Sequence, residues 1–304
     1  MKIVSLLPAA TEIVCALGLR ESLVGRSHEC DFPEDVRELP PLTRARVDPS
    51  LPSARLDEEV RRIMTARLPI YMLDEARLAA LAPDVVVTQA ACEVCAIAYD
   101  QVVASLRRTA FRARVVSLQP SRLADVLEDV QAVADACDVG ARGRALVGGL
   151  RERLERVAVS STTGARPRVA VVEWLAPPML AGHWVPDAIT AAGGAAVGPA
   201  PGAPSRYATW DEIRSLGADA VVVAPCGFDL ERTVLEAAPL AATLRALAPR
   251  VLLVDGNAYL NRPGPRLVEA VETIAAWLRG EAVPEDRAVP LQAAVSSEAS
   301  PSRA

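Results

Sequence analysis

Short runs of apolar residues alternate along the chain with segments of helical periodicity. The runs are nearly unbroken in hydrophobicity, as is typical of parallel strands that helices cover on both faces. The predicted strands are 2–6, 23–25, 85–88 and 115–118 in the first half, then 168–172, 220–224 and 251–255 in the second. Strands separated by helices predict an α/β fold with parallel sheets, and the two sets of strands predict two lobes.

A helical pattern joins the two sets of strands. Apolar residues recur at helical spacing from Leu123 to Val130 and, after a break near Gly140, from Leu146 to Val157. The second piece, about 17 residues long, would extend roughly 25 Å and could bridge two lobes. We therefore predict an N-terminal α/β lobe at 1–120, a helical linker at 121–167, a C-terminal α/β lobe at 168–280 and, because periodicity ends there, a disordered tail at 281–304.

Composition narrows the class of protein. The 304 residues are 51% hydrophobic and 23% charged, which is typical of a globular chain with a sizeable core. The net charge of −5, without a block of basic residues, argues against a nucleic-acid surface. The first dozen residues lack a charged segment followed by a long apolar one, so we expect a cytoplasmic protein, and a periplasmic location would require a misassigned start site. We also expect the protein to be a monomer.

The rare residues of the sequence follow predicted strands or lie in the loops between them. In open parallel sheets, ligands bind beyond the carboxyl ends of the strands. In the first half these positions hold Pro8, Ala9, Thr11, Glu12, His28, Cys30, Cys92 and Cys95. In the second half they hold Trp174, His183, Trp184, Cys226, Tyr259, Asn261 and Arg262. This placement predicts a ligand cleft between the two lobes.

The cysteine spacing allows more than one interpretation. Cys92 and Cys95 are two residues apart, which suits a metal site or a redox pair, and His28 with Cys30 would complete four ligands for zinc or iron. The same cysteines could instead be small buried residues at the start of a helix. His183 is the other histidine, and either imidazole could act as a ligand or as an ordinary hydrogen-bonding group.

Aromatic residues could supply flat walls for a planar ligand. Trp174, Trp184 and Tyr259 lie in loops, where their rings would either contact a ligand or pack between the lobes. The sequence contains no GxSxG, HExxH, Walker or GxGxxG pattern. The sequence therefore gives no motif-based support for a hydrolase, zinc-protease or nucleotide-binding function.

Five segments together resemble the cobalamin-binding branch of the iron/B12 substrate-binding proteins. They are Pro8–Glu12, Gly25–Pro33, Thr88–Ala96, Gly182–Trp184 and Asn261–Pro265. The resemblance covers about residues 1–280 and implies two α/β lobes joined by one long backbone helix. It also implies a binding protein, not an enzyme, that holds a corrinoid or ferric chelate between the lobes and delivers it to an ABC importer. Without an export signal, the chain is similar to leaderless members that carry Cys and His.

The leading hypothesis is a binder of cobalamin or a related corrinoid. Aromatic rings would stack on the macrocycle, polar groups would meet its amide arms, and His28 or His183 could approach the metal. Two alternatives remain open. One is a cytoplasmic protein that binds zinc or iron through His28, Cys30, Cys92 and Cys95, and the other is a thiol-dependent, cofactor-modifying enzyme.

Overall fold

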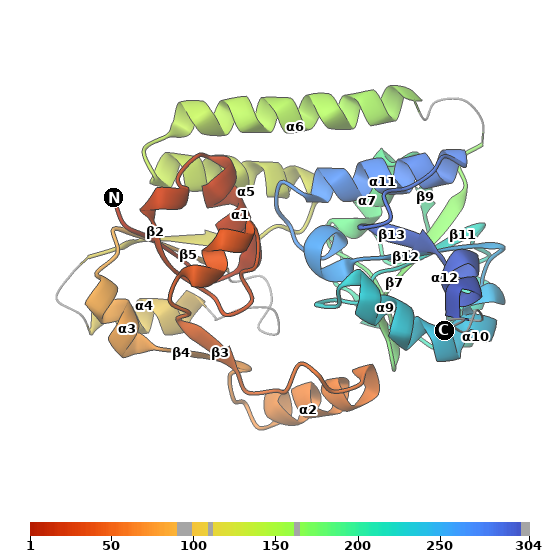
Figure 1. The fold of residues 1–304 in the computed structure, drawn as a ribbon, viewed down its shortest axis with the longest axis horizontal. Coiled ribbons are helices and arrows are strands. Elements are labelled where there is room, and N and C mark those ends of the chain that lie inside the picture. The colour runs from red at the N-terminus through yellow and green to blue at the C-terminus, as the bar shows by residue number, and fades with distance from the viewer. Residues whose placement is uncertain (90–98, 109–111, 161–164, 299–304) are drawn as a thin grey trace, which may run out of the picture. The chain divides into compact units, whose positions relative to one another are not determined.

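The described residues divide into two compact units. The computed structural model describes residues 1–89, 99–108, 112–160 and 165–298 (Figure 1). Unit 1 contains Met1–Leu51, Arg55–Pro120 and Ala124–Leu150. Unit 2 contains Pro52–Ala54, Ser121–Leu123 and Arg151–Ala304. Each unit has its own sheet.

Unit 1 contains a four-stranded parallel sheet in the order β2-β1-β5-β6. The strands are β1 Ile3–Ser5, β2 Leu23–Arg26, β5 Val85–Gln89 and β6 Arg114–Leu118. β1 and β5 are buried along their whole length, which explains why their sequences show no alternation of apolar and polar residues. The predicted parallel sheet of the first lobe is confirmed.

Helices and one short hairpin complete unit 1. The helices are α1 Pro8–Ala16, α2 Ser53–Thr65, α3 Glu75–Leu81, α4 Tyr99–Arg107 and α5 Leu123–Ala136, with short 3-10 turns at Arg20–Ser22 and Glu34–Glu38. The hairpin pairs β3 Thr43–Ala45 with β4 Tyr71–Leu73, antiparallel. The sequence pattern did not predict it, since strands this short carry almost no periodicity.

Unit 2 contains a seven-stranded mixed sheet in the order β10-β8-β7-β11-β12-β13, with β9 also paired to β7. The central parallel strands are β7 Arg168–Leu175, β11 Ala220–Val223 and β12 Arg250–Val254, and the short β9 Ala195–Ala196 runs parallel to β7. The antiparallel strands are β8 Pro178–Leu180, β10 Arg206–Tyr207 and β13 Ala288–Pro290. The predicted parallel strands therefore form the centre of a wider sheet.

The helices of unit 2 pack beside this sheet. They are α7 Val185–Ala191, α8 Trp210–Ser215, α9 Leu230–Ala237, α10 Ala241–Arg245, α11 Leu267–Arg279 and α12 Leu291–Glu298, with a 3-10 turn at Ala238–Leu240 and a π-helix, η4, at Gly256–Leu260. The apolar core contains side chains from β7, β11 and β12, and it includes Leu291 of α12. None of the helices that the structure describes combines the length and apolar composition needed to cross a bilayer.

One helix continues from the first unit into the second. α6, Gly140–Ser160, has 21 residues, and the division between the units falls between Leu150 and Arg151. At 1.5 Å per residue, this helix is roughly 32 Å long. It corresponds to the second piece of the predicted linker, and the break near Gly140 is where α5 ends and α6 begins.

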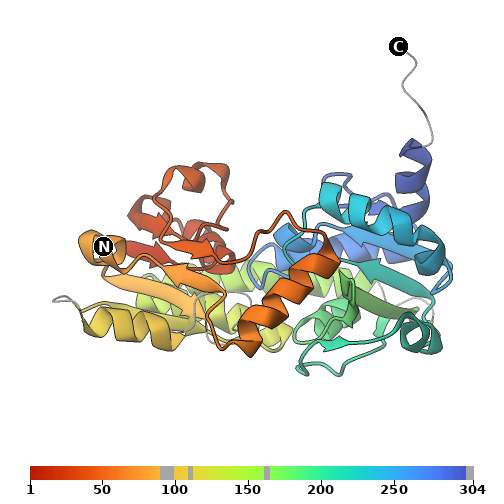
Figure 2. The ribbon, with the colours of Figure 1, turned by 90° about the horizontal axis from the view of Figure 1, so that it is seen from below.

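The predicted disorder after residue 280 is wrong for the segment that forms β13 and α12. β13 pairs with β12 in antiparallel register, and α12, the dark blue helix of Figure 2, follows it directly. Ala288, which pairs with Val254 of β12, is 1% exposed, and Leu291 is fully buried in the apolar core of the unit. A three-residue strand ending in proline gives too weak a signal to be predicted.

Candidate functional site

The first candidate surface lies at the carboxyl ends of β1 and β2. We call residues 5–12 and 26–31, together with Thr43 and Tyr71, the unit 1 edge. α1 begins directly after β1 because Pro8 occupies its first turn, where a backbone N–H is not needed. Pro8 is half-buried, and the next residues Ala9, Thr11 and Glu12 are buried.

Buried hydroxyl groups join α1 to β1 and to the loop after β2. Thr11 Oγ1 lies 2.8 Å from Ser5 Oγ and 3.0 Å from Cys30 Sγ, and the Ser5 hydroxyl donates to Leu7 O over 3.0 Å. The side chain of Cys30 is therefore turned inward, with 1% of the residue exposed. These contacts fix the start of α1 against the end of the sheet.

His28 contacts residues of the β3–β4 hairpin. Its Nδ1 lies 2.7 Å from Thr43 Oγ1, which also accepts a hydrogen bond from His28 N at 3.0 Å. The ring centroids of His28 and Tyr71 are 5.5 Å apart. Burial, with the nearby Arg26 guanidinium as a second cause, lowers the pKa of His28 below its usual value. Both effects favour the neutral form of His28.

Glu29 and Ser27 complete this group around His28. Glu29 Oε1 accepts a hydrogen bond of 2.9 Å from the Tyr71 hydroxyl and lies 4.0 Å from His28 Nε2. Ser27 Oγ lies 3.0 Å from Thr43 Oγ1. Sequence reasoning missed Thr43 and Tyr71, because the fold brings them to His28 from a hairpin that no local spacing indicated.

The predicted four-ligand metal site cannot be assembled from the described residues alone. Cys92 and Cys95 lie outside the described residues. Of the other two predicted ligands, Cys30 contacts Thr11 and His28 contacts Thr43. Within residues 1–89, 99–108, 112–160 and 165–298, no group of three or more His, Cys, Asp or Glu side chains could hold a metal ion. Convergence of the four ligands stays a prediction.

The second candidate surface lies at the carboxyl ends of β7, β11 and β12. We call residues 173–175, 183–184, 224–229 and 255–262 the unit 2 edge. Cys226 N donates to Glu173 O over 3.0 Å, and Asn257 N donates to Phe228 O over 2.9 Å. The segments after neighbouring strands are therefore joined through the backbone.

Gly256 permits an unusually close approach of two of these segments. A Cβ atom at Gly256 would lie 2.2 Å from Pro225 O, so only glycine fits without a shift of the backbone. Asp255 precedes it and caps η4 by accepting a 2.6 Å hydrogen bond from Ala258 N. Burial raises the pKa of Asp255 above its usual value. Single π-helical turns are frequent at functional sites.

Two tryptophans of the unit 2 edge are fixed but not buried. Trp174 is half-buried, and its ring centroid lies 5.1 Å from that of Phe228. Trp184 is also half-buried, and its Nε1 donates to Leu260 O over 2.9 Å. The His183 ring lies 5.8 Å from the Trp184 ring, and burial lowers the pKa of His183.

The structure places some other predicted site residues inside unit 2. Tyr259 is 9% exposed, with the guanidinium of Arg266 5.3 Å from its ring centroid. Arg262 is 4% exposed and donates to Asn257 Oδ1 over 3.0 Å. Asn261 Nδ2 donates to Ala224 O over 2.6 Å. These side chains hold the edge together, so Tyr259 does not present the open ring face expected of a ligand wall. The Cys226 residue, in contrast, is exposed.

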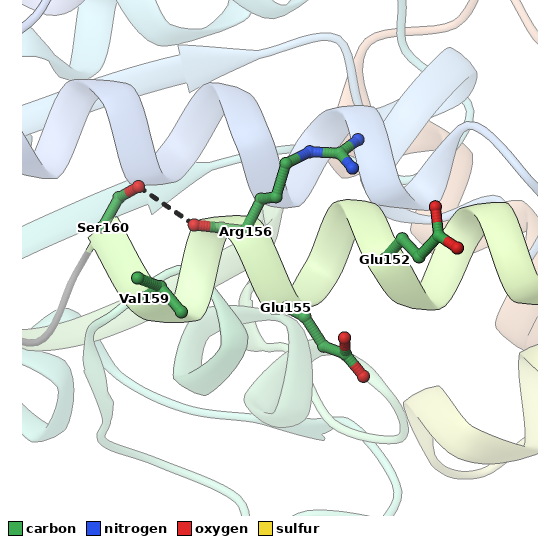
Figure 3. A pocket seen from close by; sticks show the side chains of 5 residues that line it. All are labelled: Glu152, Glu155, Arg156, Val159 and Ser160. Carbon is green, nitrogen blue, oxygen red and sulfur yellow. Dashed lines mark hydrogen bonds between the residues drawn. The ribbon is translucent and has the colours of Figure 1, made fainter.

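A hollow on the last turns of α6 contains none of the predicted site residues. It has a volume of about 590 Å³ and is lined by Glu152, Glu155, Arg156, Val159 and Ser160 (Figure 3). All of these residues come from one helix, and the Ser160 hydroxyl donates back to Arg156 O over 2.9 Å. Because no second element of the described part of the chain contributes a polar group there, the two edges are the better candidates.

Comparison with known proteins gives a consistent result. A family model described as periplasmic binding protein matches residues 3–254. The periplasmic vitamin B12 binding protein BtuF of Vibrio cholerae is similar in structure, with a TM-score of 0.67, 20% identity, and coverage of 91% of this chain and 96% of BtuF. The periplasmic heme-binding protein RhuT from Roseiflexus sp. RS-1 has a TM-score of 0.67, 20% identity, and coverage of 92% and 98%.

A further similar structure is an ABC transporter substrate-binding protein from Listeria monocytogenes EGD-e. Its TM-score is 0.68 at 16% identity, with coverage of 92% of this chain and 99% of that protein. No individually curated sequence matches the chain. At these identities the solved structures show a shared fold, and the choice of ligand must come from the residues of the two edges.

Proposed function

We propose that this chain, which belongs to the periplasmic binding protein family, binds cobalamin or a related corrinoid without transforming it. Members of the family are binding proteins, and similar structures include a vitamin B12 binder and heme binders. The fold is therefore suited to a large, flat metal chelate. The preference for a corrinoid rests on the segments that resemble cobalamin-binding proteins and on the chemistry of the two edges.

The observation that carries this proposal is the pair of fixed, half-exposed tryptophans at the unit 2 edge. Trp174 packs against Phe228, and the Trp184 ring donates a hydrogen bond to the carbonyl of Leu260. Both rings are therefore already ordered before a ligand binds. Rings held in this way give a large contact area at low entropic cost. A macrocycle offers the matching flat surface.

Charge favours a corrinoid over heme. The two edges carry four acidic residues that are partly or fully exposed, Glu29, Asp31, Glu173 and Asp229, against the basic residues Arg26 and Arg262. Arg26 donates to the carbonyls of Ser27, His28 and Arg37, and Arg262 donates to Asn257. Carboxylates accept hydrogen bonds from amide N–H groups but repel the carboxylates of heme. The amide arms of a corrin therefore suit these surfaces better.

The absorption spectrum of the protein purified from its native host tests the choice of ligand. A corrinoid spectrum, with the compound identified by mass spectrometry after denaturation, is the expected result. A Soret band would assign heme instead. A colourless protein that contains stoichiometric zinc would favour the alternative in which the His and Cys residues form a metal site.

The ABC importer implied by the sequence resemblance is part of this proposal, and the cytoplasmic location stays a separate prediction. Delivery to an importer requires the protein to meet the outer face of that importer. Fractionation of native cells, with a cytoplasmic and an extracytoplasmic marker protein, decides between a cytoplasmic and an extracytoplasmic location. Recovery with the cytoplasmic marker would exclude delivery to an importer and leave intracellular corrinoid binding.

A further inference from the structure

The Trp174 ring packs against a phenylalanine ring that is almost fully buried. Phe228 is 1% exposed, and its ring is tilted by 54° against that of Trp174, with 5.1 Å between the two centroids. Tilted pairs at this separation are a preferred arrangement of aromatic rings. The polar atom of the indole, Trp174 Nε1, donates to Ala176 O over 3.1 Å. The position of the Trp174 ring therefore depends on where the Phe228 ring lies.

The main chain of Phe228 is fixed by neighbouring segments. Phe228 N donates to Pro225 O over 3.1 Å, and Phe228 O accepts a hydrogen bond of 2.9 Å from Asn257 N. These contacts place the Cα atom of Phe228. The direction of its ring is set by the side chains that pack around it.

One of these side chains is an arginine. The guanidinium carbon of Arg232 lies over the Phe228 ring, 3.6 Å from its centroid. Arg232 belongs to the first turn of α9, and its backbone N–H donates to the Asp229 side chain over 2.8 Å. A cation at this distance is attracted to the face of an aromatic ring. Movement of the Phe228 ring away from Arg232 therefore costs free energy.

The Arg232 side chain also lies beside a carboxylate that is held in place. Glu236 Oε1 lies 3.9 Å from Arg232 Nη2, and the two side chains are 19% and 25% exposed, so solvent screens their attraction only in part. Glu236 accepts hydrogen bonds from Ser53 N over 3.1 Å and from the Ser53 hydroxyl over 2.7 Å. One row of contacts within unit 2 therefore joins Ser53, Glu236, Arg232, Phe228 and Trp174.

We infer that Arg232 positions the Trp174 ring for the ligand, acting through the face of Phe228. An apolar side chain of similar length could fill the space beside Phe228, but it would not be attracted to the centre of the ring or to Glu236. Arg232 is thus a positioning residue, since it acts through Phe228. The inference rests on the proposed function for the ligand, whereas the position of the Trp174 ring is a property of the free protein.

The surroundings of the Trp174 ring can be measured without a ligand. The sequence has four tryptophans, so the full chain labelled with 5-fluorotryptophan gives four ¹⁹F resonances, and Trp174→Phe and Trp277→Phe assign two of them. Arg232→Met keeps a long side chain beside Phe228 but removes its charge. We expect it to shift or broaden the Trp174 resonance. Arg232→Lys, which keeps the charge, should leave that resonance close to its wild-type position.

Arg250 provides a matched control in the same unit. It is the first residue of β12, and its guanidinium carbon lies 4.6 Å from the centroid of the Trp277 ring. Arg250→Met should therefore move the Trp277 resonance and leave that of Trp174 unchanged, and Arg232→Met should do the reverse.

A Trp174 resonance that is unchanged in Arg232→Met would overturn the inference, as would an equal change in Arg232→Lys. The role of Phe228 fails if Arg232→Met still moves the resonance when it is added to Phe228→Leu. The dispersion of the other resonances identifies an unfolded variant. If Arg232→Met does not fold, Glu236→Gln, which removes the charge beside Arg232 and keeps an acceptor for Ser53, must itself shift the Trp174 resonance.

Calorimetric titration with cobinamide tests the consequence for binding. Loss of a stacking ring weakens affinity five- to tenfold, so a ring that is present but misplaced should cost about threefold in Arg232→Met. Arg232→Lys and Arg250→Met should bind like the wild-type protein. Wild-type affinity in Arg232→Met would overturn the role in ligand binding. If the wild-type protein binds neither cobinamide nor cobalamin, the proposed function fails, and the ¹⁹F spectra still decide whether Arg232 positions Trp174.

Discussion

The unit 1 edge and the unit 2 edge differ in the kind of contact that stabilises each of them internally. At the unit 1 edge the contacts join side chains: Thr11 reaches Ser5 and Cys30, and Thr43 reaches Ser27 and His28. At the unit 2 edge, strand ends are joined through the backbone or by a side chain that binds a carbonyl, as Asn261 binds Ala224 O. Hydroxyl and imidazole protons can be redistributed, whereas backbone contacts cannot.

This difference predicts different roles for the two edges. The unit 1 edge should determine which polar groups of a ligand are accepted, because its donors and acceptors depend on a few protons. The unit 2 edge should provide a fixed shape, with Trp174 and Trp184 as flat surfaces. Substitutions at the two edges should therefore have different consequences for stability and for binding.

The largest effect is expected for Gly256→Ala at the unit 2 edge. The new Cβ would lie 2.2 Å from Pro225 O, a backbone atom that cannot move by itself. We expect the free energy of unfolding to fall by about 3 kcal/mol, measured by urea denaturation. Gly148→Ala is the matched control, because a Cβ there meets no atom within 4 Å and the residue lies in α6. Equal stability of the two variants would contradict the close approach.

Thr43→Val should have the next largest effect, at the unit 1 edge. It keeps the size of the side chain but leaves the Ser27 hydroxyl and His28 Nδ1 without their partner. A loss of about 2 kcal/mol in the free energy of unfolding is expected. Thr190→Val is the control, since Thr190 is exposed and its hydroxyl donates to the Pro186 carbonyl of its own helix. Similar losses in both variants would show that the buried network adds no stability.

Trp174→Ala tests the flat surface assigned to the unit 2 edge. Stacking of an aromatic ring contributes about 1 kcal/mol, so affinity for a corrinoid should fall five- to tenfold. Trp277→Phe is the control, because Trp277 is a buried residue of α11 and should affect stability without affecting affinity. Unchanged affinity of Trp174→Ala, measured by calorimetry, would remove this tryptophan from the ligand surface.

The smallest effect concerns Asp129, beside the segment that follows β6. Burial, then Asp125 and Glu128, raise its pKa from 3.8 to about 7, against an opposing backbone hydrogen bond from Gln119. The folded state therefore holds this proton more tightly than the unfolded state, and the associated stability, complete below pH 3.8, is lost as the pH rises through about 7.

Asp129→Asn removes this dependence. At pH 8 the free energy of unfolding of the variant should exceed that of the wild-type protein by about 1 kcal/mol, because solvent screens part of the effect of the raised pKa. At pH 4 the two proteins should be nearly equal in stability. Thermal denaturation at both pH values measures the difference. The exposed Asp211→Asn is the control and should show no comparable change between the two conditions. Equal stability of Asp129→Asn and wild type at pH 8 would contradict the raised pKa.

Strands that are apolar and fully buried, including the three-residue β1, could be predicted from the sequence, whereas short and partly exposed strands could not. The central parallel strands and the break near Gly140 follow from local patterns of hydrophobicity that tertiary contacts then reinforce. β3, β4 and β13 have three residues each, so their pairing is decided by partners distant in sequence. That is why the tail after 280 was expected to be disordered.

Candidate site residues could be found by their position after strands, but their individual roles could not. His28 and Trp174 are partly exposed at the edges, as expected of ligand contacts. Tyr259 follows a strand in the same way, yet its ring is buried beside Arg266 and Arg287. Orientation within a loop depends on packing that sequence spacing does not encode.

The most direct test of the corrinoid assignment is isothermal titration of the full wild-type chain with cobinamide and, separately, with cobalamin, followed by visible absorption. The account predicts saturable binding of at least one of them at one ligand per chain, with a change in the corrinoid spectrum. Absence of both heat and spectral change at high micromolar concentrations of both compounds would contradict it.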